Sequence, residues 1–184
     1  MVRTLEALGG TLADRGLDFH IAIAGAAALL LTEGLDHPTQ DVDVVAVAPS
    51  GTPLRSSQQL ELPLDLVRAA EDVAAVMGLD RDWLNAGALG VLFDRLPEGY
   101  EDRLRPTRFG NLTVSVLGRQ DLVRLKLWAA ADEGPGSRHH VALVQMGLSA
   151  AEVDDAEAWV NGLSRGGAYP GIDDVLQAVR RSLR

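Results

Sequence analysis

Residues 21–47 read IAIAGAAALLLTEGLDHPTQDVDVVAV, and this stretch decides the fold of the first half of the chain. The apolar run that ends at Gly25 predicts a strand over 18–24, and the Ala/Leu-rich run after it predicts a short helix over 26–32. β-Branched residues then predict a second strand over 41–48. The order of strand, glycine turn, helix and strand indicates a domain that mixes helices with a sheet.

Two carboxylates, Asp41 and Asp43, open the second predicted strand. Side chains two residues apart on a strand point to the same face, so this pair is expected to lie side by side. Neighbouring like charges on a half-buried strand are unfavourable unless a cation or hydrogen-bond donors neutralise them. The spacing therefore indicates a site for a hard divalent metal with oxygen ligands. The alternative is structural, with one aspartate capping the preceding loop and the other solvated at a strand edge.

Composition limits the classes of protein that remain. A chain of 184 residues is expected to form one domain, or one domain with a helical appendage. It has no cysteine, which excludes disulfides and Cys-ligated metal sites, and its four histidines leave little room for a His-rich site. No apolar run reaches the roughly 18 residues of a membrane span, and the start of the chain does not resemble a secretion signal. The sequence therefore predicts a cytoplasmic protein without a membrane partner.

The charge distribution is acidic and contains a single lysine. A net charge of −9 argues against a broad nucleic-acid-binding surface. Arg103, Arg105 and Arg108 leave room for a small basic face, and a solvated surface explains them equally well. Lys126 is the only lysine among 17 Lys and Arg residues. This bias suggests that Lys126 occupies a position where a compact ammonium suits better than a planar guanidinium.

Hydrophobic periodicity predicts the remaining elements. Helices are expected over 4–15, 63–77, 121–131, 141–146, 149–163 and 172–183, and a hairpin is expected over 103–108 and 112–117. Residues 86–93 fit either a short helix or a buried strand. Ser149 and Glu152 form a capping-box pattern at the start of one of these helices. The chain is thus divided near Gly118 into an α/β core, 1–118, and a helical segment, 119–184, that is expected to pack on it.

Three segments in this order resemble the nucleotidyltransferase superfamily, and most of all the AbiEii/AbiGii toxin-type nucleotidyltransferases and their uncharacterised bacterial relatives. The segments are GAA at 25–27, HPTQDVD at 37–43 and DLVRLKLWA at 121–129. The resemblance extends over residues 18–147. It implies the minimal form of the nucleotidyltransferase fold, with a mixed sheet flanked by helices and a helical C-terminal segment.

The resemblance also implies an activity, which is transfer of a nucleotidyl group from a nucleoside triphosphate to an RNA or protein acceptor. Mg²⁺ or Mn²⁺ would assist, held by Asp41 and Asp43, which with Lys126 form the implied catalytic set. The implied nucleotide-binding residues are Gly25, Ala26, Thr39 and Lys126. Toxin-type relatives further imply an antitoxin partner.

The chain departs from the family pattern in its acidic residues. The family adds a third carboxylate, but the predicted strand over 112–117 has none and Ala142 occupies an expected aspartate position. Asp94 and Asp132 are weak candidates for the missing carboxylate. His37, where the family usually has arginine, is a weak candidate for phosphate contact. A catalytically degenerate binding or regulatory module is therefore the alternative function.

Several of these residues also fit purely structural roles. Gly25 fits a tight turn, Lys126 fits a helix surface, and Thr39 is expected to brace its loop more than to bind phosphate. His139 and His140 are adjacent on a predicted helix, so their side chains do not face one another and form a poor metal site.

Overall fold

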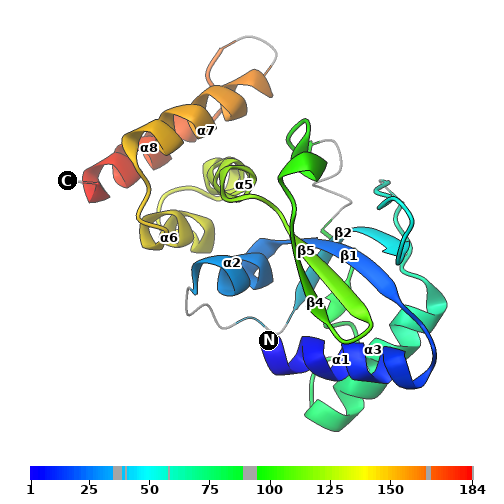
Figure 1. Cartoon of the computed structure of the whole chain (residues 1–184). Helices are drawn as coiled ribbons and strands as arrows, with labels where there is room; N and C mark the ends of the chain where they lie inside the picture. Colours follow the sequence, from blue (N-terminus) through cyan, green and yellow to red (C-terminus); the bar gives the residue numbers. More distant parts are fainter. Residues whose placement is uncertain (35–38, 40, 58, 89–94, 165–166, 184) are drawn as a thin grey trace. The chain divides into compact units, whose positions relative to one another are not determined.

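The computed structural model of the chain describes residues 1–34, 39, 41–57, 59–88, 95–164 and 167–183 (Figure 1). The described residues form a mixed sheet and helices, with a helical C-terminal part, which confirms the predicted α+β class. The chain separates into two compact units. The first comprises residues 1–94 and 99–118, and the second comprises residues 95–98 and 119–184.

The first unit contains the sheet. Its strands are β1 (Phe19–Ala24), β2 (Val42–Pro49), β3 (Leu84–Asn85), β4 (Arg105–Phe109) and β5 (Leu112–Val116). Among the described residues they are ordered β3-β2-β1-β5-β4. Strand β1 pairs antiparallel with β2, the next strand along the chain, and parallel with β5, which is distant in sequence. The predicted hairpin is present, with β4 and β5 joined through Gly110 and Asn111.

Three helices accompany the sheet: α1 (Val2–Asp14), α2 (Gly25–Glu33) and α3 (Leu64–Met77). Helices α1 and α3 lie side by side (Figure 1). Gly9 lets α1 approach the hairpin closely, because a side chain there would overlap the carbonyl of Phe109. Trp83 is fully buried, and its Nε1 donates to the carbonyl of Ala70 at 2.9 Å, which ties the entrance of β3 to α3. A short 3₁₀ helix, η2 (Tyr100–Arg103), precedes β4.

The second unit is helical and comprises α5 (Arg119–Glu133), α6 (Arg138–Gln145), α7 (Ala150–Gly162) and α8 (Ile172–Ser182). Helix α5 contacts the other three. The predicted capping box of α7 is confirmed, since the Ser149 hydroxyl accepts from the Glu152 amide at 3.3 Å and the Glu152 carboxylate accepts from the Ser149 amide at 2.8 Å. No helix in the described part of the chain is long and apolar enough to cross a membrane.

Element boundaries differ from the predictions by a few residues, with one consequence for the site. Asp41 lies just before β2 instead of within it. The first ladder contact on this side of β2 is the bond from the Val42 amide to the Trp83 carbonyl at 2.6 Å, so regular pairing begins after Asp41. Of the ambiguous segment 86–93, residues 86–88 form no helix or strand, and 89–93 lie outside the described residues.

Candidate functional site

The end of β1 and the beginning of β2 bring Gly25 against Asp43. Strand register places Ala24 opposite Asp43, and Gly25 follows directly as the first residue of α2. Gly25 has a φ of 75°, a conformation that other residues rarely adopt. An added Cβ would lie 3.2 Å from Asp43 Cγ and closer still to its Oδ2. The backbone turn therefore needs glycine both for its conformation and for space for the carboxylate.

Asp41 and Thr39 form the approach to β2. Asp41 is exposed, while Asp43 is partly buried in the sheet. The Thr39 hydroxyl donates to the Asp41 carbonyl at 3.2 Å and lies 3.4 Å from its amide nitrogen. These contacts brace the backbone that carries the first carboxylate. The Cα atoms of Asp41 and Asp43, two residues apart, are at most about 7 Å from each other.

The N-terminus of α2 supplies backbone donors next to Asp43. The first N–H groups of a helix have no partner within it and carry a partial positive charge. The N-cap residue of α2 is Ala24, which has no side-chain oxygen to cap these donors. The amides of Gly25 and Ala26 are therefore suited to an anion such as a phosphate group. The carboxylate of Asp43 benefits from the same field.

The donor set fits a hard divalent cation. Among the described residues, no group of three or more His, Asp or Glu side chains is arranged to hold a metal. Mg²⁺, however, is usually held by one or two carboxylates together with water and substrate phosphate oxygens. The two carboxylates of Asp41 and Asp43 match that smaller requirement in number, and the Asp43 carboxylate fills the space next to Gly25.

Of the two candidates for a third carboxylate, one belongs to the other unit and one lies outside the described residues. Asp132 belongs to the helical unit, where its carboxylate accepts from the Tyr169 hydroxyl at 2.9 Å. That hydroxyl also accepts from Trp128 Nε1 at 2.9 Å, so Asp132 is the last acceptor in a series of hydrogen bonds that begins at Trp128. Asp94 and His37 lie outside the described residues.

Two polar features of the sheet were missed by the sequence analysis. Asn85 lies in register with Asp43, and its side chain accepts from the Gly87 amide at 2.9 Å. A two-residue strand is too short for periodicity to detect. His20 Nε2 lies 2.7 Å from the hydroxyl of buried Ser115. Because side chains alternate along a strand, His20 was predictable on the same face of β1 as Ala24. Its partner Ser115 is 95 residues away in sequence and could not be predicted.

Lys126 is half-buried in α5, in the helical unit. Its Nζ lies 3.4 Å from His139 Nδ1, and His139 Nε2 lies 3.2 Å from a carboxylate oxygen of Glu133. Burial is the main reason that the pKa of His139 is lowered, and the charge of Lys126 lowers it further, while Glu133 opposes both. His140 points to a different partner, accepting at Nδ1 from the Gly136 amide at 3.1 Å.

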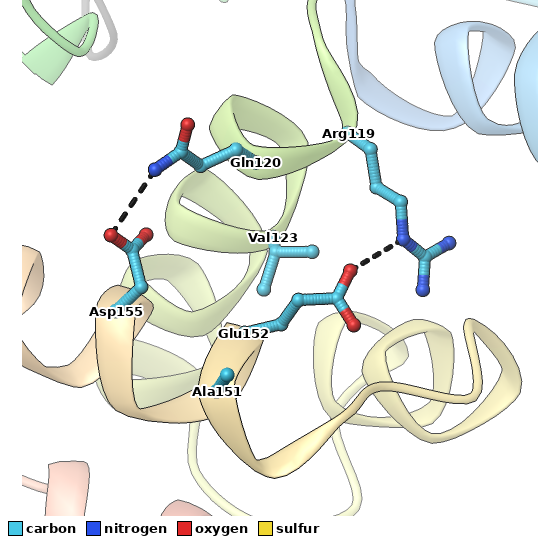
Figure 2. A pocket seen from close by; sticks show the side chains of 6 residues that line it. All are labelled: Arg119, Gln120, Val123, Ala151, Glu152 and Asp155. Atoms are coloured by element: carbon cyan, nitrogen blue, oxygen red, sulfur yellow. Dashed lines mark hydrogen bonds and ion pairs between the residues drawn. The ribbon is translucent and has the colours of Figure 1, made fainter.

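A hollow of about 280 Å³ lies between α5 and α7 (Figure 2). Arg119 donates to Glu152 at 2.6 Å across one side of it, and Gln120 donates to Asp155 at 3.1 Å across the other. Arg119 is the main reason that the pKa of Glu152 falls to about 2. The polar residues at the rim of the hollow thus link α5 to α7. None of the predicted site residues lines the hollow. The lining residues are Arg119, Gln120, Val123, Ala151, Glu152 and Asp155.

Comparison with known proteins adds no relative. No protein-family model, curated protein or solved structure matches this chain. The resemblance to nucleotidyltransferases therefore stays a prediction from the three sequence segments.

Proposed function

We propose that this chain is a metal-dependent nucleotidyltransferase that moves a nucleotidyl group from a nucleoside triphosphate to an RNA or protein acceptor. The observation that carries the proposal is the position of the Asp43 carboxylate against Gly25, at the first residue of α2. This arrangement puts a carboxylate oxygen, the ligand type that Mg²⁺ prefers, beside the backbone donors of a helix N-terminus, which favour phosphate. Such a reaction uses cytoplasmic substrates, and an antitoxin-like partner would restrain it.

The residues of the first unit have separate tasks in this reaction. A divalent ion, when bound, offsets the charge of the phosphates and of the leaving pyrophosphate. Asp41 and Asp43 hold that ion, and the amides of Gly25 and Ala26 donate to a phosphate oxygen. An acceptor oxygen forms a bond to the α-phosphorus, and its proton passes to water. The bond from that phosphorus to the β-phosphate oxygen breaks, and pyrophosphate leaves with the electron pair.

Lys126 is proposed to bind the triphosphate as a point cation. This role rests on the DLVRLKLWA segment and on the status of Lys126 as the only lysine of the chain. An ammonium can follow phosphate charge as it shifts toward the leaving group, whereas a guanidinium favours fixed bidentate pairing.

A second function, a nucleotide-binding or regulatory module without catalysis, is favoured by one observation. Strand β5, which flanks β1 on the side opposite β2, has no acidic residue, and its Ser115 is hydrogen-bonded to His20. Fewer carboxylates weaken metal binding. This module would bind a triphosphate without transferring any part of it.

Transfer assays separate the two functions. The purified chain is incubated with Mg²⁺ or Mn²⁺, each α-³²P-labelled nucleoside triphosphate, and total RNA or protein as acceptor. We expect labelled acceptor with the wild type, none with Asp43→Asn, and wild-type labelling with Asp14→Asn, a matched change at an exposed aspartate of α1. Triphosphate binding without transfer to any acceptor supports the module, and absence of binding contradicts both functions.

The role of Lys126 has an independent test. An ATP derivative with an acyl group on its γ-phosphate acylates an amine beside that phosphate. Since Lys126 is the only lysine, we expect one acylated side chain, and excess ATP should protect it. Acylation that is confined to the amino terminus, or that ATP does not suppress, contradicts the proposed contact.

A further inference from the structure

Glu133, His139 and Lys126 form a hydrogen-bonded chain inside the helical unit. Glu133 and Lys126 belong to α5, and His139 is the second residue of α6. The imidazole lies between the other two, with Nδ1 3.4 Å from Lys126 Nζ and Nε2 3.2 Å from Glu133 Oε1. The side chain of His139 is only 15% exposed, so the ring is held in place by its surroundings.

The charges around His139 select one tautomer. Lys126 can only donate, so Nδ1 must be unprotonated to accept from it, and Nε2 then carries the hydrogen. That hydrogen points to the Glu133 carboxylate, which can only accept. Arg138 Nε also lies 3.3 Å from Nε2, but accepting from Arg138 would move the hydrogen to Nδ1 and set it against the ammonium. The tautomer with hydrogen on Nε2 therefore satisfies both Lys126 and Glu133.

We propose that His139, oriented by Glu133, is a positioning residue that holds the Lys126 ammonium in place for triphosphate binding. This inference rests on the proposed function, because it assigns a purpose to the placement of Lys126. A lysine side chain has four rotatable bonds, and binding is weakened when they must be ordered. An acceptor that already orders the ammonium reduces that loss. Protonated His139 cannot accept, so the contact exists only with neutral imidazole.

The single lysine makes the contact directly measurable. A protein grown with lysine labelled at Cε and Nζ gives one side-chain signal, which belongs to Lys126. We expect the Cε chemical shift of Lys126 to change as His139 titrates, at a pH below the ordinary histidine value. His139→Asn should remove this step. Glu133→Gln should move the step to lower pH, because it removes the negative charge that favours the imidazolium.

The functional readout is the affinity for a nucleoside triphosphate, measured by calorimetry. ATP with Mg²⁺ is used, or whichever triphosphate the wild type binds. His139→Leu replaces the imidazole with an apolar side chain of similar size that has no acceptor, and we expect affinity to fall about tenfold. His139→Asn retains an acceptor near the position of Nδ1 and should stay within about threefold of the wild type. The spectra of each variant establish that it is folded before affinity is compared.

The outcomes distinguish this inference from the function on which it rests. A Lys126 signal without a step at the His139 titration, or equal affinity in wild type and folded His139→Leu, overturns the positioning role while the proposed function stands. A wild type that binds no nucleoside triphosphate overturns the proposed function and the positioning role together.

Discussion

The carboxylate of Asp43 occupies the space that a side chain at Gly25 would need. The two residues are 18 positions apart in sequence, and the antiparallel pairing of β1 with β2 brings them together. The same turn starts α2, so a carboxylate and the first amides of a helix share one corner of the sheet.

Gly25→Ala should destabilise the chain and displace Asp43. The substitution adds strain at a φ of 75° and a collision with the carboxylate, with an expected cost of about 2–4 kcal/mol. Gly78→Ala is the matched control, because Gly78 has a φ of 68° and open space around it. It should cost only about 1–2 kcal/mol. Urea denaturation measures the loss of stability in both variants. Equal losses would show that the Asp43 carboxylate does not occupy the space next to Gly25.

Divalent metal binding should depend on Asp43. Mn²⁺ binding in the presence of a nucleoside triphosphate, followed by electron paramagnetic resonance, should weaken at least about tenfold in Asp43→Asn. Asp41→Asn should weaken it in the same direction, whereas Asp14→Asn should leave it unchanged because that residue lies at the exposed end of α1. Unaltered Mn²⁺ affinity in both Asp41→Asn and Asp43→Asn would exclude this metal site.

His20 should make the chain less stable in mild acid. Burial lowers the pKa of His20 below its usual value. The unfolded chain therefore binds a proton more readily than the folded chain, so the free energy of unfolding decreases as the pH falls through the ordinary histidine pKa. Between about pH 8 and about pH 5, wild type should lose more stability than His20→Gln in urea denaturation. Parallel pH profiles would contradict the assignment.

Glu152 should contribute stability that disappears in strong acid. Its pKa of about 2, well below the usual 4.5, is caused mainly by Arg119 and secondarily by the capping contacts of Ser149. The contribution is complete above pH 4.5 and is lost as the pH falls toward 2. With allowance for solvent screening, Glu152→Gln should be about 1–2 kcal/mol less stable than wild type at neutral pH.

Comparing the stability of wild type and Glu152→Gln at a pH near the lowered pKa of Glu152 checks this explanation. Glutamine can still complete a capping box, so the difference reports chiefly the ion pair with Arg119. Wild type and Glu152→Gln should converge in acid, and Glu6→Gln, at an exposed position of α1, is the control for loss of a surface carboxylate at neutral pH. A neutral-pH difference that persists unchanged in acid would contradict the lowered pKa.

Local order along the chain was predictable because it depends on neighbouring residues. Apolar periodicity predicted the α+β class, and the strand, glycine turn and helix around Gly25 followed from it. The Ser149 capping box was predictable because both partners lie within one helical turn. The limits of β2 were predicted less well, since Val42 is bonded to Trp83, which precedes β3 and is distant in sequence.

Amino-acid order alone therefore established the elements, their succession and the Asp41 and Asp43 pair as a candidate metal site. Only the folded chain placed Asp43 against Gly25 and His139 between Glu133 and Lys126. The physical reason is that hydrophobic periodicity reports which side of an element is buried, whereas contacts between side chains depend on strand register and helix packing. Strand register and helix packing are set by the whole core of each unit, and no short segment determines them.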